Sequence, residues 1–222
     1  SARIIARQAG VLAGVEVARA TFARLDPALS FAALAEEGET VAKDQVLIRL
    51  EGSAHALLSG ERTALNFLQR LSGVSTLTRS YVGAVEGTHA RITDTRKTTP
   101  GWRHLQKWAV LQGGGVNHRM GLHDAVLIKE NHAAACGGVD EAVRRARQRA
   151  AAFGRKIAVF VEAETLAQVE SLIPLGPDRI MLDNMANETM RQAVALIRAA
   201  DPSIAIEATG GYTLETVAAA AA

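Results

Sequence analysis

From about residue 88 onward the chain alternates short apolar segments with helical patterns, and this rhythm constrains the fold more than any other feature. The strand candidates are residues 90–93, 125–128, 157–161, 179–182 and 204–207. The stretches between them, residues 102–112, 140–153, 165–173 and 187–200, carry apolar residues at helical spacing. Strands that alternate with helices indicate a parallel sheet, either open or closed into a barrel. The sequence therefore predicts an α/β domain over residues 88–222.

A cluster of polar residues follows each of these strand candidates. The carboxyl ends of the strands form the active-site face of an α/β barrel, whereas an open sheet gathers ligands mainly at one switch point. Successive strands that each deliver polar groups to one rim favour the barrel. The clusters are Asp94 to Lys97, Lys129 to His132, Glu162, Asp183 with Asn184, and Glu207 to Gly211.

The first region, residues 1–87, has a different pattern and is predicted to form a separate α/β domain. Strand candidates lie at residues 3–6, 29–35 and 41–52, and residues 15–25 have helical spacing. A long helical stretch runs from Ala54 to Val85, with Ser53 as its expected N-cap. We expect Gly60 and the Ser72-Gly73 pair to break this stretch into two or three helices.

Composition excludes several classes of protein. A single cysteine, Cys136, cannot form an internal disulfide or a zinc cluster, so nothing requires an oxidising compartment. No apolar stretch is long enough to span a bilayer, and the first residues do not resemble a signal peptide, so we expect a cytoplasmic protein. A formal net charge of +2, without a basic stripe and interleaved aromatics, does not indicate a nucleic-acid partner.

Basic side chains gather between Arg91 and His132, although the chain as a whole is nearly balanced in charge. Arginine matches carboxylates and phosphates with two hydrogen bonds, and lysine acts as a point charge. A solvated basic face is the ordinary alternative. These residues adjoin apolar strands and glycines, however, where an unpaired charge is costly. We expect an anionic ligand at the barrel mouth, bound by Arg96, Lys97, His118, Arg119 and Lys129.

Two acidic residues, Glu162 and Asp183, end successive strands at the same rim. Carboxylates there would repel an anion unless a cation lay between them, and Mg²⁺ bridging carboxylate and phosphate oxygens meets this need. The alternative is that each acid pairs with a neighbouring Arg or Lys. Glu164 is a rival for Glu162, but strand alternation places Glu162 on the face of Phe160, whereas Glu164 falls at a helix start.

Two glycine-rich segments, residues 113–119 and 209–213, can bring backbone N–H groups close to a phosphate. Each is also compatible with an ordinary turn. Neither matches the P-loop or the dinucleotide-binding fingerprint, so the sequence does not favour a nucleoside triphosphate or a dinucleotide as ligand.

Residues 93–132, TDTRKTTPGWRHLQKWAVLQGGGVNHRMGLHDAVLIKENH, closely resemble quinolinate phosphoribosyltransferase, also called nicotinate-nucleotide pyrophosphorylase (carboxylating). Residues 60–76 resemble the long helix of that family, and VEAETL, MLDNM and EATGG continue the likeness in order. The resemblance implies an N-terminal α/β sandwich-like domain (residues 1–87) and an incomplete, open α/β barrel of the type II phosphoribosyltransferase kind (residues 88–222). It also implies a homodimer with shared active sites. Family segments before residue 1 and after residue 222 are expected to be missing from the printed sequence.

The resemblance implies a glycosyltransferase of de novo NAD biosynthesis. Such an enzyme transfers phosphoribosyl from phosphoribosyl pyrophosphate to quinolinate with decarboxylation, giving nicotinate mononucleotide, pyrophosphate and CO₂. Mg²⁺ is the implied cofactor, held by Glu162 and Asp183 directly or through water and pyrophosphate.

The resemblance also implies roles for individual residues. Lys97, Glu162 and Asp183 would be catalytic, and Arg62 would reach the site of the neighbouring subunit. Thr209 replaces the usual serine of the family's phosphate loop and keeps its hydroxyl. The implied substrate-binding residues are Arg62, Arg96, Lys97, Thr98, His118, Arg119, Lys129, Glu162, Asp183, Thr209, Gly210 and Gly211.

Three other functions fit parts of this pattern. A related protein of the same fold, linked to molybdenum transport, is disfavoured because recognition of two carboxylates requires the dense cations of NHR and IKENH. A Schiff-base aldolase would use Lys129 or Lys97 as nucleophile and would need that lysine to be desolvated or depressed in pKa. A non-catalytic binder of sugar phosphates would bind quinolinate without turnover.

Overall fold

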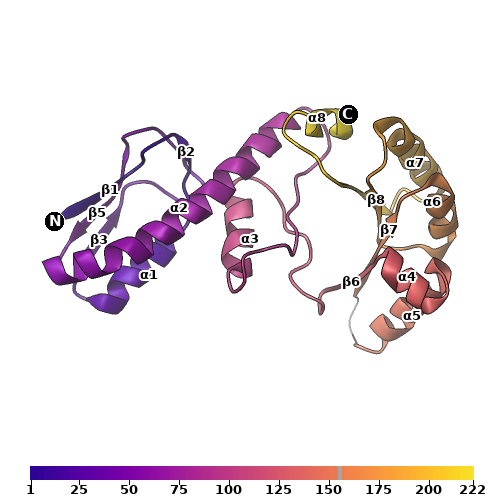
Figure 1. Cartoon of the computed structure of the whole chain (residues 1–222), viewed down its shortest axis with the longest axis horizontal. Helices are drawn as coiled ribbons and strands as arrows, with labels where there is room; N and C mark the ends of the chain where they lie inside the picture. The colour runs from indigo at the N-terminus through magenta and orange to yellow at the C-terminus, as the bar shows by residue number, and fades with distance from the viewer. Residues whose placement is uncertain (155–156) are drawn as a thin grey trace. The chain divides into compact units, whose positions relative to one another are not determined.

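A computed structural model describes residues 1–154 and 157–222, which form two compact units, Ser1–His118 and Arg119–Ala222 (Figure 1). This division differs from the boundary expected between residues 87 and 88. Residues 88–118 belong to the first unit, because α3 (Arg103–Gln112) packs against α2 (Ala54–Ala84). Within the two described ranges, no helix combines the length and apolar character that a membrane span requires.

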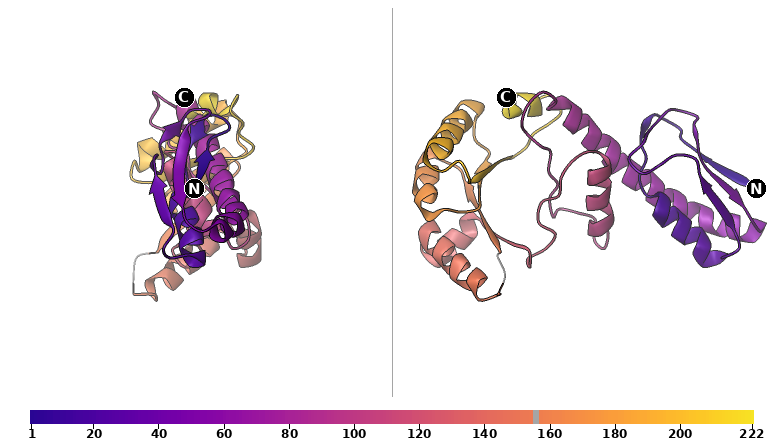
Figure 2. Two further views of the ribbon diagram at one scale, coloured as in Figure 1. Left: turned by 90° about the vertical axis from the view of Figure 1, so that its left-hand side faces the viewer. Right: turned by 180° about the vertical axis from the view of Figure 1, so that it is seen from behind.

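A three-stranded antiparallel sheet and two helices form the core of the first unit. The strand order is β1 (Ala2–Ile5), β5 (Val46–Glu51) and β3 (Ser30–Ala33). The helices α1 (Val15–Leu25) and α2 pack together beside this sheet (Figure 2). Phe22, Ile48 and Leu68 join the three elements in one buried cluster. The short strands β2 (Gly10–Val11) and β4 (Thr40–Val41) form a second antiparallel pair.

The helix α2 is continuous over 31 residues, so the expectation that Gly60 and Ser72-Gly73 break it is wrong. Its expected N-cap is confirmed, because the Ser53 side chain accepts a 3.2 Å hydrogen bond from the Ala56 N–H. At Gly60, a Cβ atom would lie 2.8 Å from the Phe22 ring. The glycine therefore permits the close approach of α1 to α2 instead of ending the helix.

Four parallel strands in consecutive order form the sheet of the second unit: β6 (Ala125–Ile128), β7 (Ala158–Ala163), β8 (Arg179–Asp183) and β9 (Ala205–Thr209). Four α-helices connect them and lie on one side of the sheet (Figures 1 and 2): α4 (Glu130–Cys136), α5 (Val139–Ala151), α6 (Leu166–Leu172) and α7 (Asn187–Ala200). The 3₁₀ helix Ile173–Leu175 follows α6, and α8 (Val217–Ala221) follows β9. A strand order without reversal, with helices on one face, is typical of a barrel segment. The predicted incomplete barrel is confirmed.

One local expectation in this region is wrong. Residues 90–93, all described by the structure, do not form a strand. Thr93 instead makes an isolated parallel bridge to Val116. Val116 donates to the Ile92 carbonyl at 2.8 Å and accepts from Asp94 at 3.2 Å. The partner segment is an irregular loop after Gly115, so the ladder does not extend. The polar segment after β6 begins α4.

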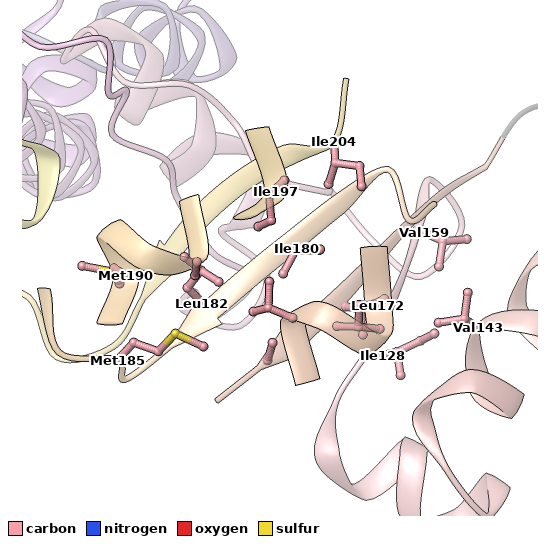
Figure 3. Close-up of a cluster of buried hydrophobic side chains, with 14 of the residues drawn as sticks. Ile128, Val143, Val159, Leu172, Ile180, Leu182, Met185, Met190, Ile197 and Ile204 are labelled. Carbon is pink, nitrogen blue, oxygen red and sulfur yellow. The ribbon is translucent and has the colours of Figure 1, made fainter. Parts of the chain in front are cut away.

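The two faces of the barrel sheet differ in character. Along β7, Val159, Val161 and Ala163 are buried, while Phe160 and Glu162 are partly exposed. The buried face packs against α5, α6 and α7 in one hydrophobic cluster (Figure 3). The opposite face of β6–β9, called the inner face from here on, carries Phe160 and Glu162 of β7.

Candidate active site

The strand register places several predicted site residues on the inner face, near the carboxyl ends of the strands. Glu162 lies opposite Met181 on β8, and Met181 lies opposite Glu207 on β9. Asp183, two residues beyond Met181, lies opposite Thr209. Residues two apart along a strand share a face. One end of the inner face therefore carries Glu162 and Asp183 on adjacent strands, as the sequence predicted.

Glu162 forms an ion pair with Lys129, which directly follows β6. The Glu162 side chain is 16% exposed and that of Lys129 is 46% exposed. The Lys129 N–H also donates to Nδ1 of His132, at 3.1 Å, in the first turn of α4. A cavity of about 230 Å³ at these strand ends is lined by Lys129, Glu162 and Glu164, among others. The structure thus brings one predicted cation and one predicted acid together beside a cavity.

Asp183 is held through both carboxylate oxygens. Thr209 Oγ1 donates to Oδ1 at 2.7 Å, and Asn184 Nδ2 donates to Oδ2 at 3.0 Å. Asn184 adopts a left-handed conformation with φ of 52°, and a Cβ on Gly210 would lie 2.8 Å from its Oδ1. Burial and the negative charge of Asp183 raise the pKa of Tyr212. Sequence reasoning gave Asn184 no role; its sequence signal was an asparagine directly after a strand-end acid.

A second ion pair on the inner face was missed from the sequence. Arg179, at the start of β8, pairs with Glu207 of β9, and their side chains are 28% and 11% exposed. The Arg179 guanidinium also lies over the Phe160 ring, 4.6 Å from its centroid. The strand alternation that selected Glu162 would have placed Glu207 on the same face.

The first unit holds Arg96, Lys97 and Thr98 on the loop that leads into α3. Lys97 is exposed and Arg96 is half-buried. Arg96 Nε is buried and makes no hydrogen bond within the described residues, as expected of a group that awaits an anionic partner. The Thr98 hydroxyl accepts a 3.3 Å bond from Arg103 Nε. His118 is tied to this loop because its backbone N–H donates to Asp94 Oδ1 at 2.9 Å.

The remaining predicted residues occupy other positions. Arg62 lies on α2, and its side chain is 71% exposed. Its Nη2 atom lies 4.0 Å from Oε1 of Glu61. Arg119 donates to the Ala125 carbonyl at 3.1 Å, at the start of β6. Gly210 and Gly211 are exposed after β9. The predicted set therefore divides between the units: Arg62, Arg96, Lys97, Thr98 and His118 belong to the first, and Arg119, Lys129, Glu162, Asp183, Thr209, Gly210 and Gly211 to the second.

The carboxylates of Glu162 and Asp183 are compatible with Mg²⁺ bound partly by other groups. Within the described residues, no three His, Cys, Asp or Glu side chains form a metal site by themselves. Mg²⁺ commonly takes one or two protein carboxylates and completes its shell with water and substrate phosphate. Glu162 and Asp183 would therefore supply part of the coordination shell, and water and substrate phosphate would supply the rest.

Comparisons with known proteins agree with the fold described above. Residues 1–72 match the N-terminal domain of quinolinate phosphoribosyl transferase, and residues 74–222 match its C-terminal domain. A probable nicotinate-nucleotide pyrophosphorylase [carboxylating] of Synechocystis sp. is 45% identical, over 99% of this chain and 74% of that protein. Its Bacillus subtilis counterpart is 44% identical, over 97% of this chain and 73% of that protein. The crystal structure of NadC from Streptococcus pyogenes superposes with a TM-score of 0.90 at 39% identity, covering 97% of this chain and 74% of that one. The chain belongs to the quinolinate phosphoribosyltransferase family.

Proposed function

We propose that this chain joins quinolinate to the phosphoribosyl group of phosphoribosyl pyrophosphate and releases CO₂, giving nicotinate mononucleotide and pyrophosphate. This is the carboxylating pyrophosphorylase activity for which its relatives are named, a step of de novo NAD biosynthesis. The structural observation that carries the proposal is the gathering of Lys129, Glu162, Asp183 and Thr209 at one end of the inner face.

Both substrates are strongly anionic, and the basic residues supply the complementary charge. Arg96, His118, Arg119 and Lys129 would bind the quinolinate carboxylates, and Lys97 and Thr98 would complete the substrate site. Arg96 Nε is buried and has no hydrogen-bond partner among the described residues, which supports this role because a carboxylate would satisfy it. Thr209, Gly210 and Gly211 would receive a phosphate. The combined field of these residues should also speed substrate capture.

The reaction needs positioning and charge stabilisation, but no covalent enzyme intermediate. The pyridine nitrogen bonds to the anomeric carbon of the ribose while the carbon–oxygen bond to pyrophosphate breaks, and the electron pair leaves with pyrophosphate. Positive charge develops on the ribose ring, where Glu162 and Asp183 stabilise it electrostatically. The pyridinium then accepts the electron pair released as the adjacent carboxylate departs as CO₂, and a proton takes its place. Holding both substrates in line supplies much of the rate.

Mg²⁺, the homodimer and the cytoplasmic location are parts of the same proposal. Bound beside Glu162 and Asp183, Mg²⁺ would neutralise charge on the pyrophosphate. The highly exposed Arg62 side chain is available to reach the site of a second copy of this chain. The lone Cys136 is compatible with a reducing compartment.

The proposal is tested by measuring quinolinate-dependent release of pyrophosphate by the intact protein. Lys97→Ala and Arg119→Ala should each lower kcat/KM by about a hundredfold, since each removes a positive charge that the proposal assigns to substrate binding. Lys43→Ala, on an exposed turn of the first unit, is the matched control and should leave the rate unchanged. Wild-type rates in both site variants would remove the site assignment.

The same protein separates the alternative functions. Quinolinate binding without turnover would indicate a non-catalytic binder and would overturn the proposal. Trapping of a carbonyl substrate on Lys129 or Lys97 by borohydride would indicate an aldolase.

A further inference from the structure

Lys107, in the middle of α3, is a buried charge with no part in the chemistry described above. Its side chain is 1% exposed, and that of its ion-pair partner Asp94 is 7% exposed. Burial of two charges is costly unless they are paired and their remaining bonding capacity is used. Ordinary packing of α3 against α2 would be served by an apolar residue at this position. The location of the pair is therefore informative.

The pair joins two segments that carry predicted substrate-binding residues. Lys107 Nζ donates to the Asp94 carboxylate and, at 2.9 Å, to the His118 carbonyl. Asp94 Oδ1 in turn accepts the His118 N–H at 2.9 Å. Both backbone polar groups of His118 are thus bonded to the pair, and Asp94 stands two residues before Arg96.

Neighbouring residues complete the network. The Asn117 amide, oriented with its nitrogen toward the pair, donates to Asp94 Oδ2 at 2.6 Å and to the Lys107 carbonyl at 3.0 Å. Elsewhere on α3, Gln106 Oε1 accepts the Thr99 N–H at 2.9 Å. Helix α3 therefore holds the 94–99 loop at several points, and Lys107 extends this hold to His118.

We infer that Lys107 and Asp94 are positioning residues for quinolinate: they hold the loop of Arg96, Lys97 and Thr98 in register with His118, so that the cations meet the two carboxylates together. The inference rests on the proposed function. When the carboxylate-binding groups are already held in fixed positions, little side-chain or loop entropy is lost on binding. The entropic cost of binding a ligand with two carboxylates is therefore lower.

The test compares Michaelis constants in Lys107→Met, which keeps the length of the side chain but removes its charge. The KM for quinolinate should rise about tenfold or more, since misplacement of binding groups by about 1 Å is costly. The KM for phosphoribosyl pyrophosphate should change much less. The double variant Asp94→Asn/Lys107→Met also removes the charge of Asp94. It should not restore quinolinate affinity, because the hydrogen bonds to His118 stay weakened.

The matched control is Ser75→Ala. Ser75 is fully buried in α2, and its hydroxyl donates to the Ala109 carbonyl of α3 at 2.8 Å. Its loss loosens the same helix without touching Asp94 or His118, so stability should fall while the KM for quinolinate stays at the wild-type value. If Lys107→Met does not fold, Asn117→Ala takes its place, because Asn117 is exposed and its loss weakens the pair without unpairing a charge.

The outcomes separate this inference from the proposed function. An inactive wild-type protein would overturn the function. An active wild type in which the Lys107→Met and Asn117→Ala variants keep the normal KM for quinolinate would overturn the positioning role alone. A similar rise in that KM in Ser75→Ala would show that general loosening of α3 is responsible, and this would also refute the role.

Discussion

The hydroxyl of Thr209 donates a 2.7 Å hydrogen bond to Oδ1 of Asp183, its in-register neighbour on the adjacent strand. Asn184 holds the other carboxylate oxygen at 3.0 Å. An acid restrained in this way is oriented before any ligand binds, and preoriented charge stabilises a developing cation most effectively. Thr209 can therefore act through Asp183 in addition to the phosphate contact implied by its family position.

Thr209→Val tests this link, because valine keeps the shape of threonine and removes the hydroxyl. We expect kcat/KM to fall about tenfold, the effect of losing one hydrogen bond to a charged group. Stability should change by about 1 kcal/mol or less, since Thr209 is partly exposed. Steady-state kinetics with urea unfolding measure both quantities.

Thr209→Ser is the control for that substitution, since it keeps the hydroxyl and matches the usual residue of the family. Activity within about twofold of wild type is expected, because both bonding roles survive. Equal losses in the serine and valine variants would show that the methyl group, not the hydroxyl, is responsible.

Glu162→Gln should lower kcat by about a hundredfold, because the amide removes the negative charge placed near the ribose. The substitution also leaves Lys129 without its ion-pair partner. Glu164→Gln is the matched control, since Glu164 lies two residues further along, is exposed, and was the rival candidate from the sequence. A greater loss in Glu164→Gln than in Glu162→Gln would reverse this assignment.

The sequence predicted the barrel segment well because its signals are local and repeated. Strand alternation along β7 placed Glu162 opposite the buried face of Val161, and the structure agrees. Parallel strands also bring their carboxyl ends to one edge, so Glu162 and Asp183 were expected together. Conversely, residues 90–93 have the residue types of a strand but pair with Val116 at one isolated bridge only. Strand propensity alone does not reveal whether a partner strand exists.

The parts of the site that were missed depend on contacts between residues distant in sequence. Nothing near Arg179 indicates Glu207, 28 positions later, as its ion-pair partner. Likewise, Lys107 has the spacing of an ordinary helix residue, and its burial against Asp94 follows from how α3 packs. A lysine in a helix is usually exposed to solvent, so the residue type alone predicts an exposed side chain at position 107, not a buried one.

Two glycines of α2 allow a matched test of stability. Gly60→Ala should lower the free energy of unfolding by about 1–3 kcal/mol, because its Cβ would meet the Phe22 ring at 2.8 Å and overpack the interface. Gly73→Ala should raise it by about 0.5–1 kcal/mol, the ordinary helix-propensity gain, since a Cβ there meets nothing within 4 Å. Urea unfolding measures both, and shifts of the same sign would contradict the packing argument.

Asp124, in the loop after Arg119, should make the free energy of unfolding depend on pH in the acid range. Burial raises the pKa of Asp124, but bonds from the backbone N–H groups of Met120 and Gly121, with the positive charge of His123, outweigh it and hold this pKa below its ordinary value of 3.8. A depressed pKa in the folded state contributes stability that is present above pH 3.8 and is lost as the pH falls through the folded-state pKa. Asp124→Asn has no proton to gain, so its free energy of unfolding should decline less steeply below this pH. Urea unfolding of both proteins from about pH 5 to about pH 2.5 measures the two slopes, and parallel profiles would exclude Asp124 as a source of the dependence.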